Sequence, residues 1–286
     1  MCSCDICHTA LSAISRRDML GLATAALATG MLLPRGEAVA QTATARRFVP
    51  DSIPATHFAD LTHVLSGDFP YIPIPGLTFP FKLTPVATLE KHGVYANKWE
   101  LIEHNGTHID APSHFIAGQI DMEAVPAETL IVPVAVIDMT EKAARNPDIA
   151  LEPDDILSWE RRNGRLPAGA AVFMKSGWDL KAMQGDAFIG MDATNTMHFP
   201  GFSETACAFL VNERDISGVG VDTISFDIGA DKEYLAHKAL FRGGKWGIEC
   251  INNLAVLPER GAVAVIGAPK VKGASGGPCR IFAFWG

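Results

Sequence analysis

The chain has 286 residues, of which 48% are hydrophobic, so it is long enough to bury a sizeable core. Its formal net charge is −8 at pH 7, and no run of basic residues stands out. This charge pattern argues against nucleic acid as a partner. No internal repeat is visible that would suggest a solenoid or another repeat architecture.

The N-terminal segment has the three parts of an export signal. Arg16 and Arg17 form a twin-arginine pair, a weakly apolar Ala-rich run follows, and residues 38–40 read Ala-Val-Ala, which fits an A-x-A cleavage site. We therefore expect residues 1–40 to be a twin-arginine export signal and residues 41–286 to form one periplasmic or otherwise exported domain. The apolar run is too short for a membrane span, so no stable membrane anchor is expected after cleavage.

The six cysteines fall into two groups of three. The first group would leave with the signal and consists of Cys2, Cys4 and Cys7. The second group is odd in number and widely spaced, which does not suggest a disulfide framework. We expect these three to be buried free thiols: Cys207, Cys250 and Cys279.

In the remaining chain, apolar runs alternate with segments of helical spacing. The sequence predicts strands at residues 60–65, 94–103, 131–139, 170–175, 219–225, 262–268 and 280–284. It predicts helices at residues 152–164, for about ten residues after Gly201, and at 231–240, with a Pro-rich loop over 69–85. This alternation indicates a single α/β domain built around a mixed sheet.

Residues 104–114 hold three imidazoles and one carboxylate. His104, His108 and Asp110 stand at even offsets, so in an extended strand they share one face, and Gly106 leaves space between them. A single His is usually a hydrogen-bonded core residue, but three in phase with an Asp are hard to explain as packing. Two imidazoles and a carboxylate at one point are typical ligands of zinc or manganese.

A second pair of ligand-type residues lies near the C-terminus. His237 and Glu249 are separated by Gly243 and Gly244, which would let the chain turn back on itself. Glu249 stands among apolar residues, where a carboxylate needs a partner or a metal. Spacing alone leaves two readings open: completion of the metal site, or an exposed His and a solvated Glu.

The pattern H-x-G-T-H-x-D-x-P-x-H at residues 104–114 resembles the signature of the metal-dependent cyclase-type hydrolases. This family includes bacterial kynurenine formamidase and isatin hydrolase. Residues 172–178, which end in Ser-Gly-Trp, and residues 218–227 are similar to two further segments of the family. The likeness extends over residues 60–284.

The resemblance implies a compact α/β domain of the swivelling β/β/α type, assembled as homodimers or higher homo-oligomers. It also implies one or two divalent metal ions per chain, zinc or manganese, and assigns His114 to proton transfer. The implied ligands are His104, His108 and Asp110 for a first metal, and Asp110, His237 and Glu249 for a second.

The resemblance further implies metal-assisted hydrolysis of a C–N bond in a small-molecule amide, and we expect the substrate to be an aryl formamide, as in the kynurenine formamidases. Those enzymes carry a pocket-shaping Trp where this chain has Ile72, with Phe69 and Tyr71 as possible aromatic walls. Export also departs from tryptophan catabolism, a cytoplasmic task. Two alternatives therefore stay open: hydrolysis of a cyclic amide of the isatin or lactam type, and a non-catalytic periplasmic protein that binds metal or ligand.

Overall fold

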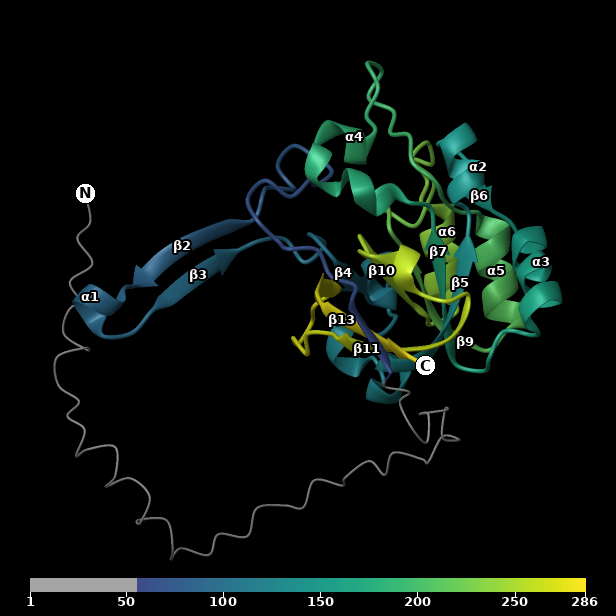
Figure 1. Ribbon diagram of the computed structural model, residues 1–286. Helices are drawn as coiled ribbons and strands as arrows, with labels where there is room; N and C mark the ends of the chain where they lie inside the picture. Colours follow the sequence, from purple (N-terminus) through teal and green to yellow (C-terminus); the bar gives the residue numbers. More distant parts are fainter. Residues whose placement is uncertain (1–55) are drawn as a thin grey trace, which may run out of the picture. The chain divides into compact units, whose positions relative to one another are not determined.

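A nine-stranded mixed sheet organises residues 56–286, which are the residues that the computed structural model describes (Figure 1). The expected export signal and its three cysteines lie outside the described residues. The strand order is β1-β13-β11-β5-β7-β9-β10-β4-β12. Two small two-stranded sheets, β2-β3 and β6-β8, complete the strand pairing.

The strands are β1 His57–Asp60, β2 Lys82–Ala87, β3 Ala96–Glu100, β4 His108–Asp110, β5 Ile131–Asp138, β6 Ala150–Leu151, β7 Ala170–Lys175, β8 Gly201–Phe202, β9 Ile216–Val221, β10 Trp246–Glu249, β11 Arg260–Gly267, β12 Gly276–Pro278 and β13 Arg280–Trp285. The α-helices are α1 Leu89–His92, α2 Thr140–Arg145, α3 Pro153–Asn163, α4 Asp186–Ile189, α5 Glu204–Glu213 and α6 Leu235–Arg242. Within the described range, no helix is long and apolar enough to span a membrane.

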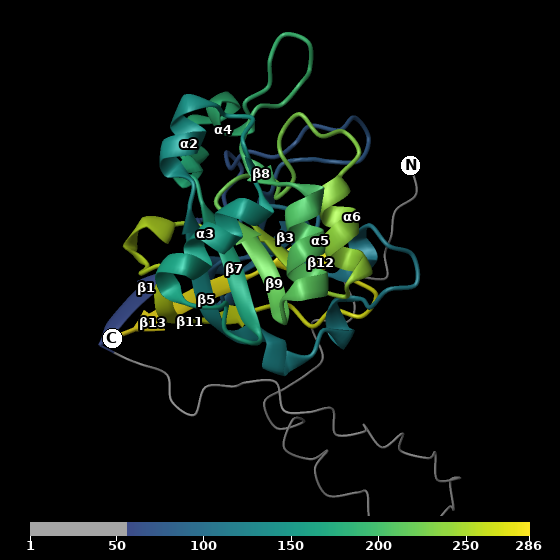
Figure 2. The same cartoon turned by 90° about the vertical axis from the view of Figure 1, so that its right-hand side faces the viewer.

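The centre of the sheet is parallel and its two ends are antiparallel. β5, β7, β9 and β10 run parallel, whereas β4, β12, β11, β13 and β1 join antiparallel neighbours. The central strands are apolar along almost their whole length because both of their faces are buried. Helices α3, α5 and α6 cover one face (Figure 2). The α/β domain with a mixed sheet is therefore confirmed.

Several predicted elements are confirmed by local chemistry. Helix α3 starts at Pro153, where the missing N–H costs nothing, and Glu152 and Asp155 form a reciprocal capping box. It ends at Gly164, whose φ of 79° only glycine adopts readily. The three cysteines of the described chain are buried free thiols, as expected.

The predicted strand at 94–103 is present as the shorter β3, which pairs only with β2 in a separate hairpin and not within the nine-stranded sheet. The predicted strand at 60–65 is displaced, because β1 ends at Asp60, where its pairing with β13 ends. The predicted strand at 219–225 ends early, at Val221, because the side chain of the next residue forms hydrogen bonds with another loop.

That residue is Asp222, whose buried carboxylate fastens the turn after β7. It accepts hydrogen bonds from the backbone N–H groups of Ser176 at 2.9 Å, Gly177 at 2.7 Å and Trp178 at 3.2 Å. The Ser176 hydroxyl donates a further bond. Two segments that are far apart in the sequence are thereby held at the same edge of the sheet, where β7 and β9 end.

The substitution Asp222→Asn is expected to lower the free energy of unfolding by about 2–3 kcal/mol, because an amide group replaces a charged acceptor of four donors. Urea unfolding followed by circular dichroism measures this loss. The matched control is Asp186→Asn at the exposed start of α4, which should change stability by less than about 0.5 kcal/mol. Equal effects of the two substitutions would show that Asp222 does not anchor the turn.

Candidate metal centre

Strand β4 places two of the predicted ligands on one face of the sheet. His108 and Asp110 are two residues apart in β4, so their side chains project to the same side. β10 pairs antiparallel with β4 and sets Glu249 directly opposite His108. The His108 Nε2 atom lies 3.3 Å from Asp110 Oδ1 and 3.3 Å from Glu249 Oε2. Strand pairing thus brings together one imidazole and two carboxylates.

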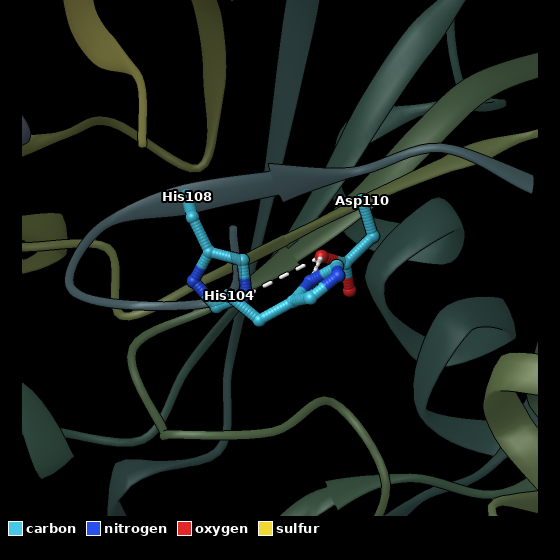
Figure 3. Close-up of side chains that lie close together, drawn as sticks. All are labelled: His104, His108 and Asp110. Carbon is cyan, nitrogen blue, oxygen red and sulfur yellow. Dashed lines mark hydrogen bonds and ion pairs between the residues drawn. The ribbon is translucent and has the colours of Figure 1, made fainter. Parts of the chain in front are cut away.

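His104 reaches the same point from a loop, so the prediction of one extended segment through His104 and Asp110 is wrong. Both partner strands of β4 stop pairing at His108, and Gly106, with a φ of 69°, turns the chain before it. His104 Nδ1 nevertheless lies 2.7 Å from Asp110 Oδ1 (Figure 3). His108 Nδ1 donates to the Gly106 carbonyl at 2.8 Å, which leaves Nε2 facing the carboxylates.

His237 approaches from helix α6. Its Nε2 atom lies 3.2 Å from Glu249 Oε1 and 3.5 Å from Asp110 Oδ2. Its Nδ1 atom hydrogen-bonds the buried carboxylate of Asp227, and the Phe226 ring stacks on the imidazole with centroids 3.5 Å apart. A carboxylate on the outer nitrogen is the arrangement that fixes the tautomer and direction of a metal-binding His.

The five predicted ligands therefore form two groups that share Asp110. One group is His104, His108 and Asp110, and the other is Asp110, His237 and Glu249, with the ligand atoms of each group within 4.8 Å of one another. Neither His108 Nε2 nor Asp110 Oδ2 has a hydrogen-bond partner among the described residues, although both are buried. Buried polar atoms are rarely left unsatisfied. Imidazole nitrogens and carboxylate oxygens without a thiolate suit zinc or manganese, so these residues fit a divalent cation.

The electrostatics of the site favour positive charge at its centre. Burial raises the pKa of Asp110, but His104 and His108 hold that pKa well below its usual value. Burial lowers the pKa of His108, yet the carboxylates of Asp110 and Glu249 outweigh burial and raise it to about 10. The pKa of His237 is likewise raised against the effect of burial. The carboxylates thus retain their charge and attract a proton or a metal cation.

His114 lies beside the two groups and belongs to neither. It follows β4 in a short 3-10 turn, Pro112–His114, and its ring stacks on that of His104 with centroids 3.6 Å apart. Burial, together with the neighbouring imidazoles, lowers its pKa to about 4 although nearby carboxylates oppose this shift. His114 is therefore a neutral imidazole at neutral pH.

A cavity of about 400 Å³ opens over these residues. His104, His108, His114, His237 and Glu249 contribute its polar part. Most of its remaining wall is apolar, with contributions from Tyr71, Ile72, Ile74, Phe115, Ile224 and Tyr234. The space suits a small, mostly apolar molecule with a polar group directed at the ligands.

The three residues predicted to shape the pocket divide into two kinds. Tyr71 and Ile72 line the cavity. Phe69 is not among its lining residues, because its ring is 2% exposed and packs against Phe188 at 6.1 Å in a separate core cluster. Tyr234 was missed, although its position three residues before His237 is a signal that sequence reasoning could have used.

Two further residues that contact the ligands were also missed. The Ser275 hydroxyl lies 3.0 Å from His104 Nε2 and donates to Glu103 at 2.6 Å. Ser275 is 171 residues from His104 in the chain, so no local spacing could connect the two.

Comparisons with known proteins agree with this geometry. Residues 59–228 match the model of the Cyclase family. The chain is 33% identical over 240 residues to isatin hydrolase of Roseibium aggregatum. This alignment covers 78% of this chain and 90% of that protein. It is 27% identical over 202 residues to kynurenine formamidase of Bacillus mycoides, with coverage of 70% and 83%.

Among solved structures, isatin hydrolase A from Labrenzia aggregata bound to benzyl benzoate superposes with a TM-score of 0.76 and 36% identity, covering 80% of this chain and 93% of that one. The family model spans more than half of the chain, and the likeness to isatin hydrolase spans most of both proteins. The chain therefore belongs to the Cyclase family and is a hydrolase of that family.

Proposed function

We propose that this protein hydrolyses a carbon–nitrogen bond in a cyclic amide of the isatin type, with one or two zinc or manganese ions bound by His104, His108, Asp110, His237 and Glu249. The observation that supports the chemistry is the two groups of possible metal ligands that share Asp110. Buried atoms of His108 and Asp110 in these groups lack hydrogen-bond partners among the described residues. The support for the substrate class is the greater likeness to isatin hydrolase than to kynurenine formamidase.

A divalent cation at this site supplies Lewis acidity, which lowers the pKa of water and polarises a carbonyl group. The protein's own residues do the remaining work. The apolar cavity wall holds the ring of the substrate with its amide group toward His108 and Glu249. His114 accepts a proton from the attacking water and delivers it to the amide nitrogen as the C–N bond breaks.

Hydrolysis of an aryl formamide is the second candidate function, supported by the likeness to kynurenine formamidase. Both candidate reactions break a C–N bond and use the same proposed proton transfer. They differ because the amide of isatin is part of a ring, whereas that of a formamide is not. The presence of Ile72 in the cavity wall, where the formamidases are expected to carry Trp, favours the cyclic substrate. A non-catalytic binding protein is the least favoured reading, because it gives His114 no task.

The substrate proposal predicts a larger kcat/KM for isatin than for N-formylkynurenine when the purified protein is assayed with saturating zinc and, separately, manganese. Opening of the isatin ring and release of formate are followed directly in the two assays. A larger kcat/KM for the formamide would reverse the order of the two candidates. No turnover of isatin, lactams, formamides or esters by a metal-loaded sample would instead favour a binding protein.

The substitution His108→Ala is expected to remove bound metal, because it deletes a nitrogen that lies between two carboxylates. Elemental analysis of the purified protein gives metal atoms per chain. The matched control is His198→Ala, since His198 binds Asp148 and Asp192 at the surface, away from the site. Unchanged metal content in His108→Ala would contradict the ligand assignment.

The substitution His114→Ala should leave the metal content intact and reduce turnover about a hundredfold or more, because it removes only the proton-transferring group. Metal content and kcat are measured on the same preparation. Loss of metal from this variant would mean that His114 is a ligand, and its proposed role would then be wrong.

We also propose that the chain assembles as a homodimer or higher homo-oligomer through the β2-β3 hairpin. An isolated two-stranded hairpin is marginally stable in water, yet this one exposes Leu83 by 50% and Trp99 by 69%. The double substitution Leu83→Ser with Trp99→Ser should reduce the mass measured by light scattering to that of one chain. Leu180→Ser, which alters an exposed apolar residue elsewhere, should not. A monomeric wild-type protein would overturn this proposal.

A further inference from the structure

The three imidazoles of the proposed metal centre are not held in the same way. His108 and His237 direct Nε2 at the carboxylates and bind a carbonyl or carboxylate through Nδ1. His104 is reversed, because its Nδ1 faces Asp110 at 2.7 Å and its Nε2 faces away from the site. Its side chain is also 21% exposed, against 3% for each of the other two. His104 therefore needs a support of its own.

Ser275 and Glu103 provide that support. Glu103 Oε2 accepts hydrogen bonds from the Ser275 hydroxyl at 2.6 Å and from the Ser275 backbone N–H at 2.9 Å. A carboxylate can only accept, so the single hydroxyl proton of Ser275 is directed to Glu103. The Ser275 oxygen is then an acceptor for His104 Nε2, 3.0 Å away. His104 thus carries a proton on Nε2. Its Nδ1 hydrogen-bonds Asp110 in the absence of metal and is the nitrogen that would bind a cation.

The backbone fixes this hydroxyl relative to the ligands. Ser275 immediately precedes β12, and its carbonyl accepts from the Ala111 N–H at 2.8 Å, next to the end of β4. The neighbouring Gly276 leaves room for the His104 ring, since a Cβ there would lie 2.7 Å from its Cε1 atom. His114 stacks on the ring at 3.6 Å. Packing therefore sets the plane of the imidazole, and Ser275 sets its tautomer.

We propose that Ser275 and Glu103 are positioning residues that select the His104 tautomer competent to bind metal. The inference rests on the metal centre of the proposed function and is independent of the substrate. The two residues act through His104 and do not contact the reacting atoms. Their effect should therefore be seen in metal affinity, measured without substrate.

The test is the dissociation constant of the full chain for Zn²⁺ and for Mn²⁺, measured by competition with a chromophoric chelator. Ser275→Ala removes the hydroxyl but retains the backbone bond to Glu103, and we expect it to weaken binding about 10- to 100-fold. Ser275→Thr restores a hydroxyl and should recover the affinity. Glu103→Gln frees the direction of the hydroxyl proton and should also weaken binding.

The matched control is Glu123→Gln. Glu123 Oε2 accepts from the Gly273 backbone N–H at 3.0 Å, so it tethers the same loop without contacting a His. We expect this variant to bind metal like the wild type. The thermal midpoint of each metal-free variant separates loss of affinity from loss of folding.

Three outcomes would overturn the inference: unchanged affinity in Ser275→Ala, no recovery in Ser275→Thr, or an equal loss in Glu123→Gln. Tight binding by the wild type with any of these results would contradict only the positioning role. Absence of metal binding by the wild type would contradict the metal centre together with it. Failure to hydrolyse isatin, by contrast, would leave the affinity comparison intact.

Discussion

The burial of the Asp110 carboxylate is the constraint on which the rest of the site depends. This side chain is inaccessible to solvent, and the carboxylate of Glu249 lies in the same buried cluster. Two buried negative charges are costly unless positive charge and hydrogen-bond donors surround them. The imidazoles of His104, His108 and His237 meet that requirement, and each is directed at Asp110. The same arrangement leaves ligand atoms without partners, which is what a cation site requires.

The sheet makes this arrangement possible by placing a short strand between two others. β4 pairs with β10 on one side and with β12 on the other, so its three residues are surrounded by backbone. Small residues in the partners let bulky groups approach. A Cβ at Gly247 would lie 2.3 Å from the Phe226 ring, and that ring stacks on His237. The close packing of Gly247 against Phe226 therefore contributes directly to the position of His237.

The cavity lies over this polar centre, and its wall is the part of the structure that a substrate would contact. Its apolar wall comes largely from the loop before β2, whereas its polar residues come from β4, β10, the segments on either side of β4, and helix α6. The loop before β2 supplies wall residues but no candidate metal ligand. A family of hydrolases can keep the ligands and change such a loop, which agrees with relatives named for both a cyclic and an open-chain amide.

The sequence by itself determined the α/β class, the central strands and the cluster of ligand types, because these follow from local apolar runs and from close spacing. The even offset of His108 and Asp110 survives in β4 since both residues belong to one strand. The even offset of His104 carried no such meaning, because Gly106 turns the chain before β4 begins. Only the tertiary structure brought Ser275 to His104, paired Glu249 with His108 and turned Phe69 into the core. Those relations depend on contacts between distant segments, and the pairing register and packing that create them are not properties of any local stretch of sequence.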